Sequence, residues 1–399
     1  MKKILVLLLL LALTVPAAAE SVRLEGDGFD TPEEAALAFV DALNRADAGG
    51  MLSAFAMESF TAHADPILSL EHNNSFTYNS IYSIPYTDGF LRSLVTHARY
   101  GRIASDLLLC FGEYAVGMGM NTPAVSYPEV EALFVSSPLY DLKGHVEFVE
   151  WLSPAAVTGG VAADPRWGGD TVVEAAYSGA EDLAELAARL RINGNDAYLS
   201  LQCARYDGRW YLLGPGKAQQ YMTKSSLEAF LILPDDQEKQ KLENTLAEDH
   251  AEETAQWDAL RASDLGGSLW YLESLNAPGV ALCGSPEDAK TDGGGAGVYA
   301  EMRFFSVGGG IITVWAAPAL QQALSMDDPT AHIRFSWNPS GISTEYTVAK
   351  RGKTFTFPNF RAFHDEDIAL DLTGLSIQMD ETSVVFTLQD GTKAVFRRQ

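Results

Sequence analysis

The chain is poor in cysteine, with 3 among 399 residues. An odd count at the wide spacing of Cys110, Cys203 and Cys283 excludes a disulfide framework as the basis of the fold. Cys110 and Cys203 stand in apolar runs and are interpreted as small buried residues. One bridge between these two remains open as an alternative in an oxidising compartment.

Positive charge is also scarce. The sequence has 28 Lys and Arg against 53 Asp and Glu, which gives a formal net charge of −25 at pH 7. Such a field repels nucleic-acid phosphates and anionic lipid headgroups, so no nucleic-acid partner is expected. Because 47% of the residues are hydrophobic, the chain can build a large core, and its length suggests two domains.

Long apolar runs are confined to the N-terminus. Lys2 and Lys3 precede an apolar stretch at positions 4–15, which only Thr14 interrupts, and small residues follow at 16–19. This is the order of a removable secretory signal. We therefore predict a signal peptide at residues 1–19 and an extracytoplasmic location of bacterial type, with the protein secreted, on the cell surface or in the periplasm.

An uncleaved N-terminal anchor is the alternative to a signal peptide. About a dozen apolar residues are too few to span a bilayer core of about 30 Å. The next most apolar segment, 104–119, is interrupted by Asp106 and Glu113. No transmembrane segment is therefore expected in the mature chain.

A strong helix start follows the leader. Thr31 can cap a helix, Pro32 suits its first position, and Glu34 completes a capping box. Apolar residues then recur at helical spacing up to Ala46, and a second short helix is predicted between Met51 and Phe60.

A tight hairpin is predicted further along the chain. Residues 197–205 alternate as a strand, Asp207 and Gly208 form the turn, and residues 210–213 return. The opening TPEEAALAFVDALNRADAGGMLSAF and the closing LSLQCARYDGRWYLLG resemble the NTF2-like (cystatin-like) superfamily. The resemblance implies an α+β cone in which a curved sheet wraps around a long helix.

The middle of this domain departs from that family. Residues 61–195 are longer than the family needs and carry Pro-, Gly- and Asn-rich interruptions. We interpret the excess as insertions in an NTF2-like domain spanning 28–222; another α+β family is the alternative. Residues 143–151 are predicted to form a strand, and residues 181–191 a helix.

An acidic helical connector is predicted at 223–264. A capping box at 225–228 precedes a helix that restarts near 233 and runs to about Ser263, before Gly266 and Gly267. Its apolar stripe is thin and its other faces carry acids, so a mostly solvated helix is expected rather than a partner-binding one.

In residues 265–399 the apolar residues recur at every second position instead of at helical spacing. Short candidate strands joined by tight turns predict an antiparallel meander, either a closed barrel or a sandwich. Closure is favoured because it removes exposed edges. The candidate strands are 269–276, 299–307, 311–316, 333–337, 343–349, 354–357, 369–379, 383–388 and 394–397.

The ends of this segment, LGGSLWYLES and VVFTLQDGTKAVFRR, resemble lipocalin-like domains of the calycin type. The family spaces its Gly and Trp by one residue, whereas two residues separate Gly267 from Trp270 here. The resemblance implies that Trp270 closes one end of a barrel with Arg397 or Arg398 over its ring. An eight-stranded barrel holds one small ligand or is filled by its own side chains.

Ligand-binding candidates lie in the inserted middle of the first domain. The candidate ligand-binding residues are Tyr78, Tyr82, Tyr86 and His97, because an aromatic cluster with nearby titratable groups can form the wall of a binding site. Plain packing is the alternative explanation for the tyrosines. None of these residues aligns with the catalytic groups that NTF2-like enzymes place inside the cone.

Metal and cofactor motifs are lacking. His250 and Glu253 have ligand-like helical spacing but no second histidine nearby, so no zinc site is predicted. Residues 363–367 are interpreted as an exposed turn rather than a calcium loop. The glycines at 293–297 precede a strand instead of a helix and are interpreted as a flexible connection rather than a phosphate loop.

The leading hypothesis is an exported, non-enzymatic binding or surface protein with two domains that can hold ligands. A small hydrophobic molecule, a peptide or an envelope protein is the expected partner, and no cofactor is expected. An NTF2-like lyase or isomerase using general acid–base catalysis is one alternative, which requires two convergent titratable groups in an apolar pocket. A purely structural envelope protein is the other.

Overall fold

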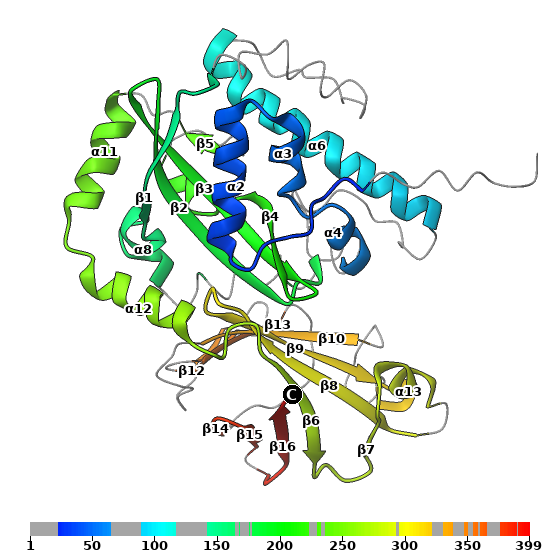
Figure 1. Cartoon of the computed structure of the whole chain (residues 1–399). Helices are drawn as coiled ribbons and strands as arrows, with labels where there is room; N and C mark the ends of the chain where they lie inside the picture. The colour runs from blue at the N-terminus through cyan, green and yellow to red at the C-terminus, as the bar shows by residue number, and fades with distance from the viewer. Residues whose placement is uncertain are drawn as a thin grey trace, which may run out of the picture.

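The computed structural model of the chain (Figure 1) places two sheets of mainly antiparallel strands one above the other, with helices around the upper one. The signal segment and Tyr78, Tyr82 and Tyr86 lie outside the described residues. The described residues are 23–64, 89–116, 142–163, 167, 175, 178–222, 230–232, 236–292, 295–320, 330–337, 347–349, 354–357, 360–364, 376–388 and 390–399.

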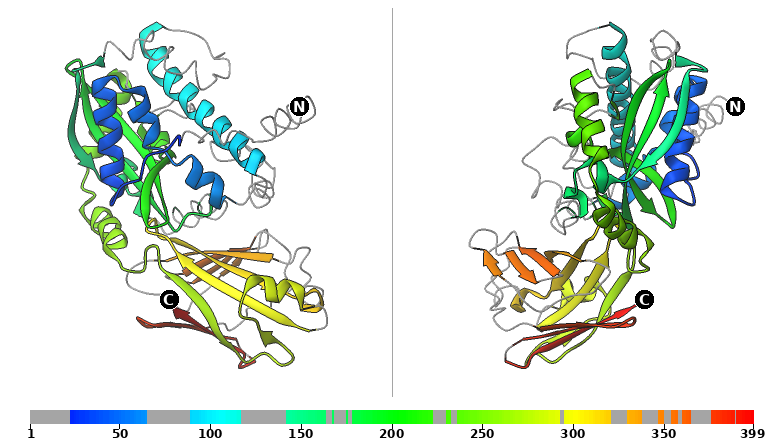
Figure 2. Two further views of the ribbon diagram at one scale, coloured as in Figure 1. Left: turned by 45° about the vertical axis from the view of Figure 1, so that its right-hand side comes forward. Right: turned by 90° about the vertical axis from the view of Figure 1, so that its left-hand side faces the viewer.

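The first sheet runs in the order β1-β2-β3-β4, and β5 pairs with β3. Figure 2 shows it between two helical layers, with α2 on one side and α11 on the other. Its strands are β1 (Val146–Leu152), β2 (Asp182–Ile192), β3 (Asn195–Tyr206), β4 (Arg209–Pro215) and β5 (Leu231–Ile232). Its helices are α2 (Pro32–Arg45), α3 (Ala48–Ser53), α4 (Glu58–His63), α6 (Gly89–Val116), α8 (Pro154–Val157), η2 (Val161–Ala163), α10 (Gln219–Met222), α11 (Asp236–Ala247) and α12 (Ala251–Ala262).

Local signals at the two ends of this unit are confirmed. The Thr31 side chain accepts a hydrogen bond from the Glu34 amide at 3.2 Å, as a capping box requires. Asp207 and Gly208 have φ values of 49° and 73°, the left-handed conformations that a two-residue hairpin turn needs. Short-range chemistry therefore determines where α2 begins and where β3 turns into β4.

The helix predicted at residues 181–191 is wrong, because this segment is strand β2. It pairs with β3 over its whole length, from Asp182 opposite Arg205 to Ile192 opposite Asn195. Both of its faces are buried: Leu186 packs among α2, α3 and α6, while Ala187 packs among α8, α10 and α11. A strand buried on both faces has no polar face, so its periodicity does not distinguish it from a helix.

The connector is two helices rather than the single one predicted. α11 ends at Ala247 and α12 begins at Ala251, with residues 248–250 between them. Leu242 of α11 is buried against the first sheet. Trp257 of α12, which is fully buried, was not recognised as part of the apolar stripe. The rest of both helices is mainly exposed, in agreement with a mostly solvated connector.

The second sheet has the order β11-β12-β13-β10-β9-β8-β6-β16-β15-β14, and β7 pairs with β8. The predicted closed barrel is not confirmed, because within the described strands no pairing joins β14 to β11. Both end strands are very short, which limits the exposed edge without closure. The strands are β6 (Leu269–Leu275), β7 (Ala281–Leu282), β8 (Gly297–Phe304), β9 (Gly309–Ala316), β10 (Thr330–Ser336), β11 (Thr347–Ala349), β12 (Thr354–Phe357), β13 (Phe360–His364), β14 (Ser376–Met379), β15 (Ser383–Thr387) and β16 (Lys393–Arg398).

Two details of this unit differ from the sequence prediction. Phe363 and His364, expected in an exposed turn, belong to strand β13, which pairs with β10 and β12. Helix α13 (Pro286–Thr291) was not predicted, although Ser285 caps it by accepting from the Asp288 amide at 3.1 Å. The turn itself and the first glycines of 293–297 lie outside the described residues.

Trp270 is the centre of the apolar cluster packed on the second sheet, called the second core below, which also contains Phe304, Phe335 and Phe396. Its side chain is fully buried and its ring lies 5.8 Å from that of Phe304. The Arg398 guanidinium lies over the Trp270 ring at 5.8 Å, so the arginine that the lipocalin-like resemblance places there is Arg398 rather than Arg397. This contact exists without a closed barrel.

A third apolar cluster, called the shared core below, joins the two units. The turn between β8 and β9 lies directly below the first sheet in Figure 1, and its Phe305 and Val307 are almost fully buried. They pack in one cluster with Leu183 and Tyr206 of the first sheet and with Trp257 of the connector. The hairpin tip of the second unit is therefore part of the hydrophobic core of the first.

The part of the chain that the structure describes contains no helix long and apolar enough to cross a membrane.

Candidate functional site

The residues chosen from the sequence are not brought together within the described part of the chain. Tyr78, Tyr82 and Tyr86 lie outside it. His97 is exposed on α6, where its Nδ1 lies 2.7 Å from the Ser93 carbonyl oxygen one helical turn earlier. His97 therefore faces solvent and not the interior between the first sheet and α2.

Among the described residues, apolar side chains between the first sheet and α2 pack as one buried cluster. Its largest members include Phe39 and Phe55, whose rings meet edge to face with centroids 5.8 Å apart. Cys203 is a free thiol in this cluster and is fully buried. Burial raises the pKa of the Cys203 thiol well above its usual range. The thiolate is therefore disfavoured, and Cys203 is unsuited to nucleophilic chemistry.

A buried arginine stands at the edge of this interior. Arg99 of α6 is 1% exposed, and it donates hydrogen bonds to the carbonyl oxygens of Ala56 at 2.7 Å and Leu213 at 2.8 Å. Its guanidinium also lies 4.0 Å from the Phe60 ring centroid. These contacts tie α6 to the segment before α4 and to β4, which is a structural task for the charge.

Glu25 makes a similar tie nearby. Its carboxylate accepts from the Met57 amide at 2.8 Å, the Ser59 amide at 2.9 Å and the Ser59 hydroxyl at 2.6 Å. Glu58 reciprocates by accepting from the Leu24 amide at 2.8 Å. The two carboxylates hold the N-terminal segment against α4, so both are engaged with backbone donors rather than directed at an open pocket.

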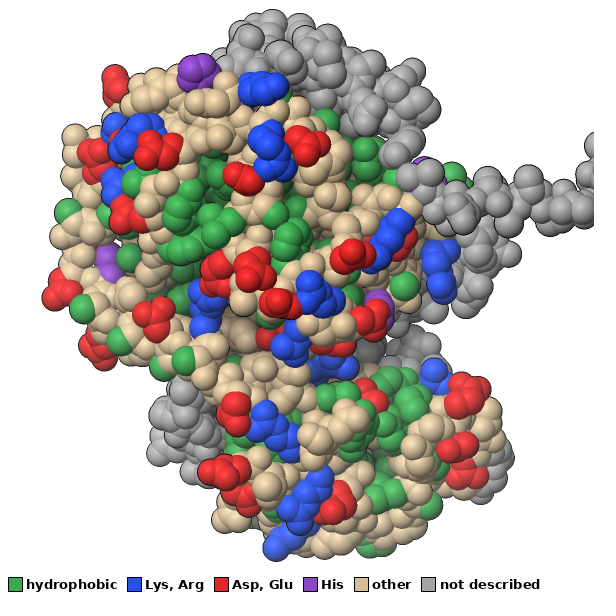
Figure 3. All heavy atoms as spheres, viewed as in Figure 1, with side chains coloured by type: hydrophobic (Ala, Val, Ile, Leu, Met, Phe, Trp, Pro, Cys, Tyr) green, Lys and Arg blue, Asp and Glu red, His purple; other side chains and the backbone are tan. Residues whose placement is uncertain are grey.

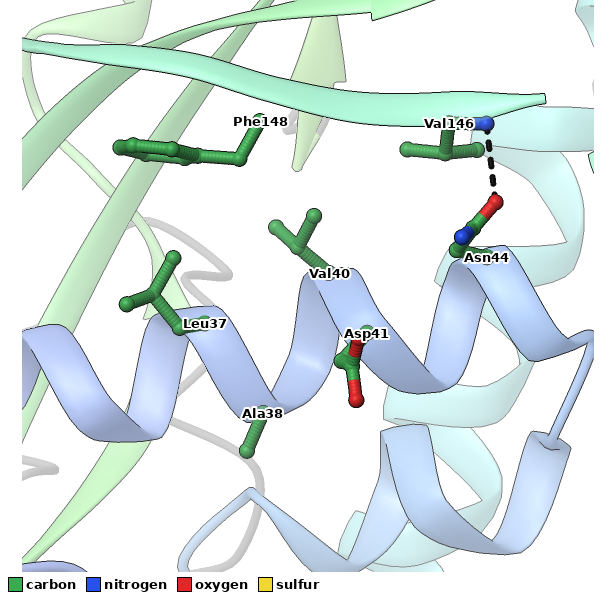
Figure 4. A pocket seen from close by; sticks show the side chains of 7 residues that line it. All are labelled: Leu37, Ala38, Val40, Asp41, Asn44, Val146 and Phe148. Atoms are coloured by element: carbon green, nitrogen blue, oxygen red, sulfur yellow. Dashed lines mark hydrogen bonds between the residues drawn. The ribbon is translucent and has the colours of Figure 1, made fainter. Parts of the chain in front are cut away.

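An open groove lies on the surface between α2 and the edge strand β1 (Figure 4). Its volume is about 310 Å³. Leu37, which is 37% exposed, forms one end, and Asn44 closes the other by accepting a hydrogen bond from the Val146 amide at 3.0 Å. The lining residues are Leu37, Ala38, Val40, Asp41, Asn44, Val146 and Phe148.

The edge of β1 resists further strand pairing. A bulge shifts the register between Phe148 and Glu150, and charged pairs continue along the strand. Glu147 pairs with Arg191 at 3.1 Å, and Glu150 pairs with Arg189. A bulge and edge charges both disfavour an added strand. The groove therefore offers apolar side chains to a ligand rather than a free backbone edge.

Charges of both signs surround the groove. Asp41 pairs with Arg45 one turn later on α2 at 2.5 Å. Figure 3 shows acidic and basic side chains interspersed on this face, with hydrophobic side chains gathered in the region of α2 and β1. The groove therefore combines apolar side chains with polar groups and has a locally balanced rim, although the whole chain is strongly acidic.

Asp182 is a buried carboxylate where the two units meet. It is 2% exposed and accepts from the Ser306 amide and hydroxyl, both at 2.7 Å, and from the Leu183 amide at 2.9 Å. Arg205, which donates to the Gly267 carbonyl at 3.2 Å, supplies a nearby positive charge. Desolvation outweighs these contacts and raises the pKa of Asp182.

No three histidine, cysteine or carboxylate side chains lie close enough to hold a metal ion in the described ranges. His250 precedes α12, with its Nε2 3.1 Å from the Thr245 carbonyl oxygen. His250 lies at the break between α11 and α12, and its side chain is 10% exposed.

Arg99 and Asp182 were missed at the sequence level. A charged residue among the apolar helical positions 95, 100, 103 and 104 was a signal for Arg99, since a buried charge must find partners. Asp182 had no comparable signal, because its partner Ser306 lies 124 residues away.

No family model and no curated protein matches the sequence. Among solved structures, the chain is similar to the crystal structure of a cystatin-like protein from Ruminococcus gnavus, at 10% sequence identity and a TM-score of 0.30. The match covers 71% of this chain and 85% of that one. A similarity at this level does not establish the fold. The mixed α+β architecture with antiparallel sheets is shown instead by the helices and strands described above.

Proposed function

We propose that the chain is an exported, non-enzymatic protein that binds an extracytoplasmic component on its surface, in the groove between α2 and β1. The packing of the described interior supports this proposal: its residues form a cluster of the protein's own apolar side chains between the first sheet and α2. The open groove, in contrast, offers exposed apolar surface at Leu37. An apolar segment of a peptide or of an envelope protein suits it, and a small hydrophobic molecule is the alternative ligand.

The buried charges support a binding role over a catalytic one. A lyase or isomerase of the NTF2-like type needs two titratable groups that converge in an apolar pocket. Arg99 and Glu25 instead hold backbone groups of neighbouring segments. The NTF2-like assignment of the first unit and the lipocalin-like assignment of the second remain part of this proposal.

A purely structural surface protein is the second candidate. The shared core favours it, because Phe305, Val307 and Trp257 join the two units over buried apolar surface. Such a joint suits a rigid structural protein rather than one whose two units open and close around a ligand.

Site-specific photo-crosslinking in the producing cells tests the binding role. A photoreactive amino acid replaces Leu37 in the groove, and the matched control replaces Val161, which is 41% exposed away from the groove. The proposal expects one discrete adduct from position 37 that position 161 does not form. Equal adducts from both positions, or none from position 37, would favour the purely structural candidate.

Export is tested separately by sequencing the N-terminus of the mature protein. The proposal expects Glu20 as the first residue, in an extracytoplasmic fraction. A chain that keeps residues 1–19 and stays in the cytoplasm would refute export while leaving the groove untouched.

A further inference from the structure

Three aromatic side chains form a row across neighbouring strands of the second sheet. Tyr271 of β6 lies 6.3 Å from Tyr299 of β8, and Tyr299 lies 5.6 Å from Trp315 of β9, measured between ring centroids. We call these three residues the aromatic row. All three are only partly buried, so large apolar rings meet solvent on three successive strands.

The aromatic row occupies the face of the sheet opposite the second core. Side chains alternate along a strand, and the neighbours of the row point the other way. Trp270 and Ala300 are buried in the second core, and Val314 packs against it. The row therefore does not belong to the second core, and its rings contact one another across the strands.

Polar groups that can bond hydroxyls flank the rings. The Tyr299 hydroxyl donates to Glu301 at 2.9 Å, and the Tyr271 hydroxyl donates to the Gln399 side chain at 3.3 Å. Arg397, opposite Tyr271 in the sheet, pairs with Glu273 at 2.8 Å. Donors and acceptors thus alternate beside an apolar surface.

We propose that the aromatic row binds a linear neutral saccharide. A pyranose has one apolar C–H face, which can stack on an aromatic ring, and a rim of hydroxyls, which can bond to flanking polar groups. The distances between neighbouring ring centroids are close to the repeat of one sugar unit in an extended chain. The row therefore matches successive units of a glycan in both chemistry and spacing.

Charge selects a neutral ligand. The net charge of −25 disfavours anionic polysaccharides. Charges of both signs act on Tyr271: burial and the Glu301 carboxylate raise the pKa of its hydroxyl, Arg303 lowers it, and Arg397 lies opposite Tyr271 in the sheet. The carboxylates Glu273 and Glu301 balance these two arginines, so the surface is locally neutral.

This site lies in a different unit from the groove between α2 and β1, so either can fail without the other. A structural role is the competing explanation, since cross-strand aromatic pairs stabilise sheets by about 0.2–1 kcal/mol. That role would leave the protein without affinity for sugars.

Calorimetric titration of the mature full-length chain with cellohexaose, xylohexaose and chitohexaose tests the proposal. At least one of these neutral probes should bind. Trp315→Ala should weaken binding about tenfold or more, Trp315→Phe should retain most of it, and Leu282→Ala, at an exposed site in the same unit, should leave it unchanged. Circular dichroism identifies any variant that fails to fold, in which case the Phe variant and Tyr299→Ala carry the comparison.

Three results would overturn the proposal. The first is a folded wild-type protein that binds none of the three probes, which would leave the structural role. The second is unchanged affinity in every variant of the row. The third is row-dependent binding of polygalacturonate or choline in preference to the neutral sugars. None of these results bears on the crosslinking at position 37.

Discussion

Replacing Asp182 with alanine should loosen the joint between the two units. The carboxylate accepts two hydrogen bonds from Ser306 across the joint and one from Leu183 within its own strand. Alanine leaves the Ser306 amide and hydroxyl without these acceptors in a partly buried place. It also removes the negative charge beside Arg205, which contacts the chain at Gly267.

The expected cost is about 1.5 to 3 kcal/mol of joint stability. A hydrogen bond to a charged acceptor contributes about 1.5–3 kcal/mol, and the desolvation that raises the pKa of Asp182 offsets part of the sum of its hydrogen bonds. The matched control is Asp27→Ala, because the Asp27 side chain is 96% exposed and pairs only at the surface with Arg23. It should change stability by less than about 0.5 kcal/mol.

Hydrogen exchange followed by mass spectrometry measures this effect at the joint. The Ser306 amide donates to Asp182, so peptides that cover residues 304–309 report it directly. In Asp182→Ala their exchange should accelerate about tenfold or more relative to wild type and to Asp27→Ala. Unchanged exchange in these peptides would show that Asp182 does not hold the joint.

Asp182→Asn separates the charge of this residue from its shape. The pKa of Asp182 in the folded protein lies above its ordinary value of 3.8, because burial disfavours the charged form. Protonation therefore favours the folded state. The free energy of unfolding of wild type should rise relative to Asp182→Asn as the pH falls from above the folded pKa to about 3.8, and this advantage should be lost as the pH rises again. A difference independent of pH in chemical denaturation would contradict the assigned shift.

Three further outcomes are expected. Gly267→Ala should destabilise the protein more than Gly279→Ala, as measured by urea denaturation. Both glycines have φ near +70° to +80°, but only at position 267 would a Cβ atom collide with the Arg205 side chain of β3. Equal losses of stability would mean that backbone strain alone matters. In native protein, iodoacetamide should modify Cys283 before Cys203, because Cys203 is fully buried; prior labelling of Cys203 in a mass-spectrometric time course would contradict this packing. Hydrogen bonds from the β14–β15 turn lower the pKa of Asp380 to about 2. The stabilisation by its carboxylate should therefore be complete above the pKa of the unfolded chain and be lost as the pH falls through about 2. A carbon-13 NMR titration of Asp380 with an ordinary midpoint would refute this shift.

Features that depend on neighbouring residues could be predicted from the sequence. The cap at Thr31 and the turn at Asp207 and Gly208 need side chains within three positions, and both are present as predicted. Most strands of the second sheet were also located, because solvent on one face produces alternation of polar and apolar residues. The exact domain boundaries stay a prediction.

Features that depend on distant residues could not be predicted. β2 is covered on both faces by helices from other parts of the chain, so its alanine-rich run looks helical in isolation. The open order of the second sheet depends on which end strands pair, and neither short end carries a local signal for it. The groove between α2 and β1 joins residues more than 100 positions apart, and Asp182 meets Ser306 over a similar separation.

Differential scanning calorimetry of the mature chain tests the central claim most directly, namely that the shared core makes the two sheets one body with binding surfaces at fixed positions. Phe305 and Val307 lose their cover if either unit unfolds. The account predicts one cooperative transition for the wild-type protein. Two independent transitions, each unaffected by substitutions in the other unit, would contradict it.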